Sequence, residues 1–143
     1  MDKITFTIYG KAQAQQRAGE RVTASGHIHH YDQDESKSAK KEIKDTAFHT
    51  VKGKWPQFDC PVNLAVKELR AIPKSWSAKK KTAALQGEVR PTSKPDLKNL
   101  IWLVEDCLNG LMWVDDSRIV SFDGSGKWYS ALPPCTIIEI TAL

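Results

Sequence analysis

Four acidic residues lie in or beside one amphipathic segment, residues 94–120. Asp96 precedes the apolar repeat of this segment, and Asp106 lies within it. Asp115 and Asp116 follow it. Carboxylate oxygens are the ligands that Mg²⁺ prefers, and a metal ion held by them can activate water and neutralise charge on the leaving oxygen of a phosphodiester. Because a lysine-rich segment comes before these acids, the pattern suggests a metal-dependent nuclease that acts on DNA.

The spacing of these acids limits the kind of site that they can form. The apolar repeat predicts a main helix over residues 97–109 that stops at Gly110, and such a helix is about 18 Å long. Acids at its two ends can share a metal ion only if the following turn folds back and brings Asp115 or Asp116 toward the two earlier acids, or if a second subunit completes the site. The alternative for the Asp-Asp pair is a turn in which it caps the next element.

Cations crowd into the segment before the main helix. The formal net charge of the 143-residue chain is only +4, but a local basic patch matters more for polyanion binding than the total charge. Phosphate contacts from such residues would weaken as salt rises. The alternative is a solvated charged face. The predicted DNA-binding residues are Lys79, Lys80, Lys81, Arg90, Lys94 and Lys98, with Arg17 and Arg21 as candidates for the same surface.

The elements that must position these residues follow an α+β pattern. Period-two alternation predicts strands, and polar-apolar repeats without Gly or Pro predict helices. The predicted strands cover residues 4–9, 62–69, 118–122, 127–129 and 136–141, with a loop and weak hairpin at 17–31. The predicted helices begin at residue 34 or 36 and end at 50, cover the short segment 77–87, and include the main helix. The order predicts a mixed sheet covered by helices, in a single domain over residues 1–143.

Apolar spacing also predicts which helix faces are buried. The main helix should bury Leu100, Leu103, Val104, Cys107, Leu108 and Leu111, and the first helix should bury Ile43, Ala47, Phe48 and Val51. Trp102 lies on the opposite, polar face of the main helix, although a large ring exposed to water usually has a partner that covers it. The remaining tryptophans are predicted to pack within the fold rather than to stack on bases: Trp55, Trp76, Trp113 and Trp128.

Cysteine and histidine usage indicates neither a disulfide framework nor a zinc site. The three cysteines are far apart and lack a CxxC spacing, which favours a reducing cytoplasm. His29 and His30 are adjacent, and in a strand they would point to opposite faces, which disfavours chelation by that pair. The first ten residues alternate like a strand, and no segment is long and apolar enough to span a bilayer. We therefore expect neither export nor membrane insertion.

The acidic segment resembles the RusA family of Holliday-junction resolvases. The family pattern runs K-P-D-x-D-N-L-x-K, then x-x-x-D-A-L-N-G, and then D-D-S-x-I after a hydrophobic turn. The matching residues here are Lys94-Pro95-Asp96, Asn99-Leu100, Asp106, Leu108-Asn109-Gly110, Asp115-Asp116-Ser117 and Ile119. Residues 72–96 resemble an insertion typical of phage-borne members, and residues 4–17 resemble the family's opening strand and Gln-Arg loop. The resemblance covers nearly the whole chain.

This resemblance implies a RusA-like fold and Mg²⁺-dependent, paired symmetrical nicking of four-way DNA junctions. It implies a homodimer, because two symmetrical nicks need two sites related by a twofold axis. The implied catalytic residues are Asp96 and Asp116, with Asp115 beside them. The same three residues and Asp106 would bind Mg²⁺, for which Mn²⁺ could substitute. The family further implies a phage or prophage protein that acts in the cytoplasm of a bacterial host.

Two residues depart from the family pattern. Lys98 replaces the second Asp of the D-x-D pair, and Trp102 replaces the Lys four residues later. Lys98 changes the local charge by two units, and its repulsion of a cation is of order 4 kcal/mol per pair of unit charges at about 4 Å. Metal affinity should therefore fall. The same Lys98 could instead pair with Glu105 or Asp106, and Trp102 could be half-buried against the N-terminal loop.

These departures leave several functions open. The chain could be a junction endonuclease, impaired or not. It could also be a natural member that binds branched DNA without cutting it, with Lys98 on a phosphate and Trp102 stacked on an unpaired base or covering a dimer seam. Lys98 could also have been introduced on purpose to disable the enzyme. A general nucleic-acid or protein adaptor would instead show no preference for junctions over linear duplex.

Overall fold

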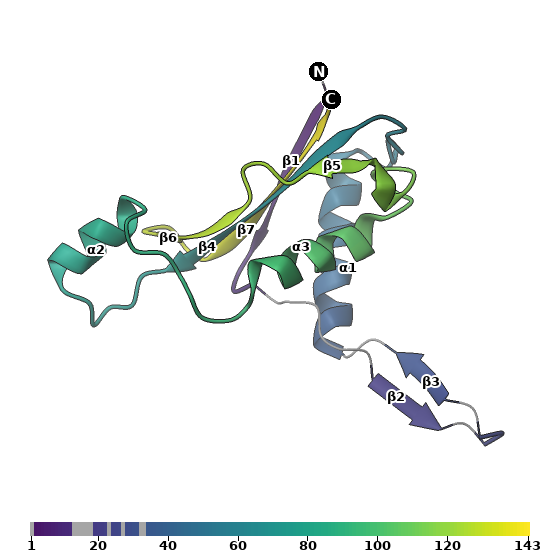
Figure 1. Cartoon of the computed structure of the whole chain (residues 1–143), viewed down its shortest axis with the longest axis horizontal. Coiled ribbons are helices and arrows are strands. Elements are labelled where there is room, and N and C mark those ends of the chain that lie inside the picture. Colours follow the sequence, from purple (N-terminus) through teal and green to yellow (C-terminus); the bar gives the residue numbers. More distant parts are fainter. Residues whose placement is uncertain (1, 13–18, 23, 27, 32–33) are drawn as a thin grey trace.

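The centre of the molecule is a mixed β-sheet with its outer strand in two pieces. The structure is a computed structural model that describes residues 2–12, 19–22, 24–26, 28–31 and 34–143. The sheet consists, in spatial order, of β1 (Lys3–Tyr9), β7 (Cys135–Ala142), β4 (Val62–Ala71), and then β5 (Ile119–Ser121) and β6 (Gly126–Ser130). β7 is antiparallel to both of its neighbours, whereas β5 and β6 run parallel to β4. Because β1 pairs with β7 from Lys3 onward, the two chain ends lie together (Figure 1).

Two helices cover one face of this sheet. α1 (Asp34–Thr50) packs on β1 and on α3 (Leu97–Leu108), which in turn contacts β4 (Figure 1). The stripe predicted for α3 is buried except for half-buried Leu111, and it meets the apolar side chains of β4 and β7 in one core. From α1, Ile43 and Ala47 are buried as predicted. Phe48 is 43% exposed, contrary to prediction, because its ring packs on the half-buried Trp55 instead of entering the core.

Two further units extend from the sheet and its covering helices. β2 (Gly19–Val22) and β3 (Ile28–Tyr31) form an antiparallel pair, which confirms the predicted hairpin within its described residues. α2 (Ala78–Leu85) contacts β6 at the end of the sheet far from the chain ends (Figure 1). Ser77, the first residue of the predicted segment 77–87, caps α2, since its hydroxyl accepts a hydrogen bond from the Lys80 amide.

The predicted α+β class is confirmed. The strand pattern did not predict how the strands pair at the outer edge of the sheet. β5 and β6 do not pair with each other across their glycine turn. They follow one another along β4, with Ile119 opposite Val62 and Gly126 opposite Lys67. None of the helices in the described ranges is long and apolar enough to cross a membrane.

Candidate functional site

The chain reverses direction immediately after α3. Gly110 has a φ of 78°, a backbone conformation that favours glycine. The next residues are tied to the segment before β4: the Phe58 amide donates to the Met112 carbonyl at 3.0 Å, and the Val114 amide donates to the Phe58 carbonyl at 3.1 Å. The Trp113 side chain is fully buried below this turn. These contacts fold the segment back along α3, which is one of the two arrangements that the sequence left open.

The fold-back brings Asp116 close to the polar face of α3. The indole Nε1 of Trp113 donates a hydrogen bond to Asp116 Oδ1 at 2.7 Å and fixes that carboxylate. Burial raises the pKa of Asp116, and the negative charges of Asp115 and Asp106 raise it further, while the Trp113 hydrogen bond opposes them. Burial also raises the pKa of Glu105, and the charge of Asp116 adds to this effect. Two carboxylates, Glu105 and Asp116, therefore repel each other, and neither forms an ion pair with a described residue.

The other three predicted acids lie in different settings. Asp106 forms an ion pair with Lys40 of α1, with 2.5 Å between Oδ2 and Nζ. Asp115 accepts a hydrogen bond from the Ser117 amide at 3.0 Å and so caps a 3₁₀ turn, Asp116–Arg118. The hydrogen bonds from Ser117 lower the pKa of Asp115. The predicted alternative, a capping role for the Asp-Asp pair, thus holds for its first member.

Asp96 lies at the opposite end of α3. It is the exposed N-cap residue of the helix, and its side chain makes no capping hydrogen bond. It precedes Glu105 by nine residues, which corresponds to about 13 Å along the helix axis. Asp96 is therefore not brought to Asp116 by the fold-back alone.

The neighbouring carboxylates Glu105 and Asp116 do not form a complete metal site by themselves. Within the described ranges, no three His, Cys, Asp or Glu side chains converge on one metal position. Mg²⁺, however, is usually held by one or two carboxylates, together with water and substrate phosphates. Glu105 and Asp116 supply two oxygen donors whose mutual repulsion a divalent cation would relieve. The sequence reading missed Glu105, because only the fold-back makes it a neighbour of Asp116.

The two departures from the family pattern lie on the same face of α3. Lys98 is exposed and forms no ion pair with any residue of the described ranges, so the alternative in which it pairs with Glu105 or Asp106 does not hold. Trp102 is 54% exposed. Both line a groove together with Glu105 and Phe122. We call this surface, with Asp116, the α3 face.

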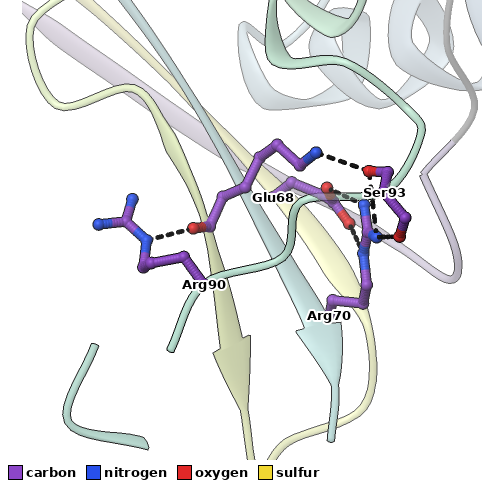
Figure 2. A network of polar contacts seen from close by, with 5 residues as sticks. Glu68, Arg70, Arg90 and Ser93 are labelled. Atoms are coloured by element: carbon purple, nitrogen blue, oxygen red, sulfur yellow. Dashed lines mark hydrogen bonds and ion pairs between the residues drawn. The ribbon is translucent and has the colours of Figure 1, made fainter. Parts of the chain in front are cut away.

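A separate polar network ties the connector before α3 to the sheet. Glu68 in β4 is only 3% exposed, and its carboxylate accepts two hydrogen bonds from Arg70, each at 2.8 Å. Arg70 also donates to the Ser93 hydroxyl at 2.8 Å (Figure 2). The Ser93 carbonyl accepts from Lys127 of β6, whose own carbonyl accepts from Arg90. This β4–β6 network therefore fixes the connector just ahead of Lys94.

Cations cover two aromatic rings near the β4–β6 network. Lys80 Nζ lies 4.0 Å from the centre of the Trp76 ring, and the Arg90 guanidinium lies 4.4 Å from the centre of the Trp128 ring. The second stack lies over Gly126, where an added Cβ would come within 2.5 Å of the Trp128 ring. These tryptophans pack as predicted, and their partners keep positive charge at the surface.

The remaining predicted DNA-binding residues lie on α2, on the connector, in β2 or outside the described residues. Lys79 is exposed and Lys81 half-buried on α2, and Lys94 is exposed at the end of the connector. Arg21 lies in β2, and Arg17 lies outside the described residues.

Comparison with known proteins identifies the family. The chain matches the family model of endodeoxyribonuclease RusA over residues 10–141. It therefore belongs to the RusA endodeoxyribonuclease family, and this membership supports an endonuclease that resolves Holliday junctions. The uncharacterized protein YqaN of Bacillus subtilis (strain 168) is 38% identical over 148 residues, which cover 99% of this chain and 100% of that relative.

Proposed function

We propose that this chain is a structure-selective endonuclease that nicks four-way DNA junctions in symmetrical pairs, as a homodimer and with Mg²⁺ or Mn²⁺. The observation that carries this proposal is the pair of neighbouring carboxylates Glu105 and Asp116: burial raises the pKa of each, and the charge of Asp116 raises the pKa of Glu105 further. Such a pair favours a bound cation. The cytoplasmic location and the phage or prophage origin stay predictions.

Glu105 and Asp116 would hold the metal ion, which when bound supplies an activated water and neutralises the leaving oxygen. Trp113 keeps Asp116 in position through its indole hydrogen bond. Asp115 adds negative charge beside Asp116. Asp106 can join the site only by exchanging its ion pair with Lys40. Asp96 stands at the far end of α3. It would therefore meet only a DNA strand that extends along this helix.

The basic residues would hold the DNA backbone. Lys79, Lys81 and Lys94 are predicted to contact phosphates of one arm, and the cations stacked on Trp76 and Trp128 add fixed positive charge. Arg17 and Arg21 stay candidates for contacts to the DNA backbone.

A second candidate function is binding of branched DNA without cleavage. The observation that favours it is Lys98, a cation without an ion-pair partner in the described residues, at the position of a family Asp. A cation lowers the affinity of the α3 face for metal and raises it for phosphate.

The test is cleavage of a synthetic four-way junction in Mg²⁺ or Mn²⁺ by the chain and by its Lys98→Asp variant, at protein concentrations where both bind. Cleavage by the unaltered chain is the expected result, and Asp116→Asn serves as the inactive control. Binding without cleavage, restored by Lys98→Asp, would establish the binding-only function. Failure of both versions to cut would refute the endonuclease proposal.

A further inference from the structure

A groove on the outer side of α3 exposes two aromatic rings, each of which is only partly covered by described residues. The Trp102 and Phe122 residues are 54% and 42% exposed. Trp102 comes from the middle of α3 and Phe122 from the segment after β5, so two distant parts of the chain supply the two rings. The groove is lined by Leu97, Lys98, Ile101, Trp102, Glu105 and Phe122. Exposed apolar side chains that gather in one groove offer a surface on which a ligand can pack.

The other tryptophans of the chain show what is unusual about this groove. Trp113 is fully buried, and Trp76 and Trp128 each lie under a cation. Trp102 and Phe122 make no ring or cation contact with the part of the chain that the structure describes. Within the described ranges, the exposed surface of these two rings is therefore available to a ligand.

The charges of the groove favour one kind of partner. Lys98 lines it without an ion-pair partner in the described ranges, and it lies one helical turn before Trp102. A second copy of this chain, seated on the rings, would have to cover Lys98 and Glu105, and burying charges without partners is unfavourable. A nucleotide matches these groups, because its flat base can stack on the exposed rings and its anionic phosphate can pair with Lys98.

We propose that this groove binds one unpaired nucleotide of branched DNA, with the base against Trp102 and Phe122 and its phosphate on Lys98. The proposal rests on the proposed function and adds a means of substrate selection to it. Glu105 lines the same groove, so a strand that follows it passes from the aromatic rings to the carboxylate pair. The groove would hold the strand beside those carboxylates.

This site would recognise structure rather than sequence. Every base has a flat face, so stacking on aromatic rings is tolerant of sequence. Bases inside a duplex are already stacked and paired, and taking one out is least unfavourable where pairing is weakened. The branch point of a junction offers such bases, whereas a linear duplex does not. The groove should therefore increase affinity for junctions and leave affinity for linear duplex unchanged.

The test combines binding with cross-linking, in EDTA so that no cleavage intervenes. Trp102→Ala, Phe122→Ala and the control Tyr9→Ala are titrated with a four-way junction and with a linear duplex of the same sequence. Tyr9 is an exposed aromatic residue at the end of β1, outside the groove. A branch-point 5-iodouracil is then photo-cross-linked to the unaltered protein, and the attached residue is identified by mass spectrometry.

The expected result is a loss of junction affinity of about five- to a hundredfold for Trp102→Ala, the range for one stacked base. The affinity of Trp102→Ala for linear duplex should be unchanged, as should both affinities of Tyr9→Ala. The cross-link should form on Trp102 or Phe122. Equal losses for junction and duplex, or a cross-link elsewhere, would overturn the proposal. A loss of dimer in sedimentation of Trp102→Ala, with no cross-link in the groove, would overturn it in favour of a second copy as the occupant.

A further arm separates this proposal from the proposed function. A single-stranded oligonucleotide that carries 5-iodouracil presents unpaired bases without a junction. If the unaltered protein does not prefer junctions but this oligonucleotide cross-links to Trp102, the groove is confirmed and junction selectivity fails. If the protein prefers junctions and neither probe cross-links to the groove, the nucleotide site is refuted while the proposed function stands.

Discussion

The α3 face and the β4–β6 network both gather charged and aromatic side chains, but their local balance differs. In the network, Glu68 is paired with Arg70, and nearby cations cover the Trp76 and Trp128 rings. On the α3 face, two carboxylates repel each other and the aromatic rings are exposed. Groups that find partners within the fold stabilise it, whereas groups left without partners are available for a ligand. This contrast is the reason for proposing that the network positions the connector and that the α3 face binds the ligand.

The largest effect is expected from the α3 face itself. Asp116→Asn keeps an oxygen that can accept the Trp113 hydrogen bond but removes a metal-binding charge. Junction cleavage, measured in the Lys98→Asp background if the unaltered chain does not cut, should fall at least about a hundredfold, since even supporting residues of metal sites are worth ten- to a hundredfold. Junction binding in EDTA should not weaken. Retained cleavage would contradict the role of Asp116 on this face.

The second prediction concerns loss of the Glu68–Arg70 ion pair in the network. Glu68→Ala leaves the Arg70 guanidinium without its partner, and breaking a largely buried pair should lower the free energy of unfolding by about 3 kcal/mol. Urea denaturation followed by fluorescence measures this change. The exposed pair of Lys41 and Asp45 provides the control, because Lys41→Ala should leave stability unchanged. If both substitutions lowered the free energy of unfolding equally, the buried pair would stabilise the fold no more than the exposed pair does.

The network should also control the connector that leads to α3. Arg70 holds Ser93, which directly precedes Lys94. In Glu68→Ala, limited proteolysis should cut within residues 88–95 faster than in the unaltered protein, since a released backbone is more accessible to protease. An unchanged cleavage pattern would show that the connector is held by other contacts.

A smaller effect is expected from the cations at the α2 end. Neutralising Lys79, Lys80 and Lys81 together should reduce the slope of log affinity against log salt by up to about 3, because each phosphate contact contributes about 0.9. Lys80 is partly engaged with Trp76, so a reduction of about 2 is the central expectation. Binding of the junction at several salt concentrations provides the slope. An unchanged slope would refute the assignment of this cluster to DNA.

The smallest predicted effect has the opposite sign. Asp116→Asn removes the repulsion between this residue and Glu105, so the metal-free variant should be more stable than the unaltered protein by about 0.5–1 kcal/mol. Thermal melting in EDTA detects the difference. The unaltered protein, and not the variant, should gain stability on addition of Mn²⁺. A less stable variant would show that the carboxylates on the α3 face do not oppose folding.

Much of the fold followed from local patterns. The strands β1, β4 and β7 and the helices α1 and α3 were predictable because alternation and helical apolar spacing are properties of short segments. Ser77 and Gly110 marked helix ends for the same reason. Phe48 was misplaced because its spacing on α1 fits the buried stripe, while only the loop that carries Trp55 draws its ring away from the core.

The candidate site was predictable only in part. The residue types near α3, the basic segment and the family resemblance all followed from the sequence. The pairing of Glu105 with Asp116 and of Lys40 with Asp106 did not, because each joins elements that lie far apart along the chain or meet only after a turn. The same holds for the groove that Phe122 shares with Trp102.

The sequence by itself determined which residues could do chemistry and which segments would carry them, since residue type and short-range periodicity are local. Tertiary structure decided which of those residues meet. The hydrogen bonds between residues 57–58 and 111–114 fold the Asp-Asp pair back onto α3, and the indole of buried Trp113 holds Asp116 by a hydrogen bond. Packing of distant segments also sets which charges are neutralised and which remain open to a ligand.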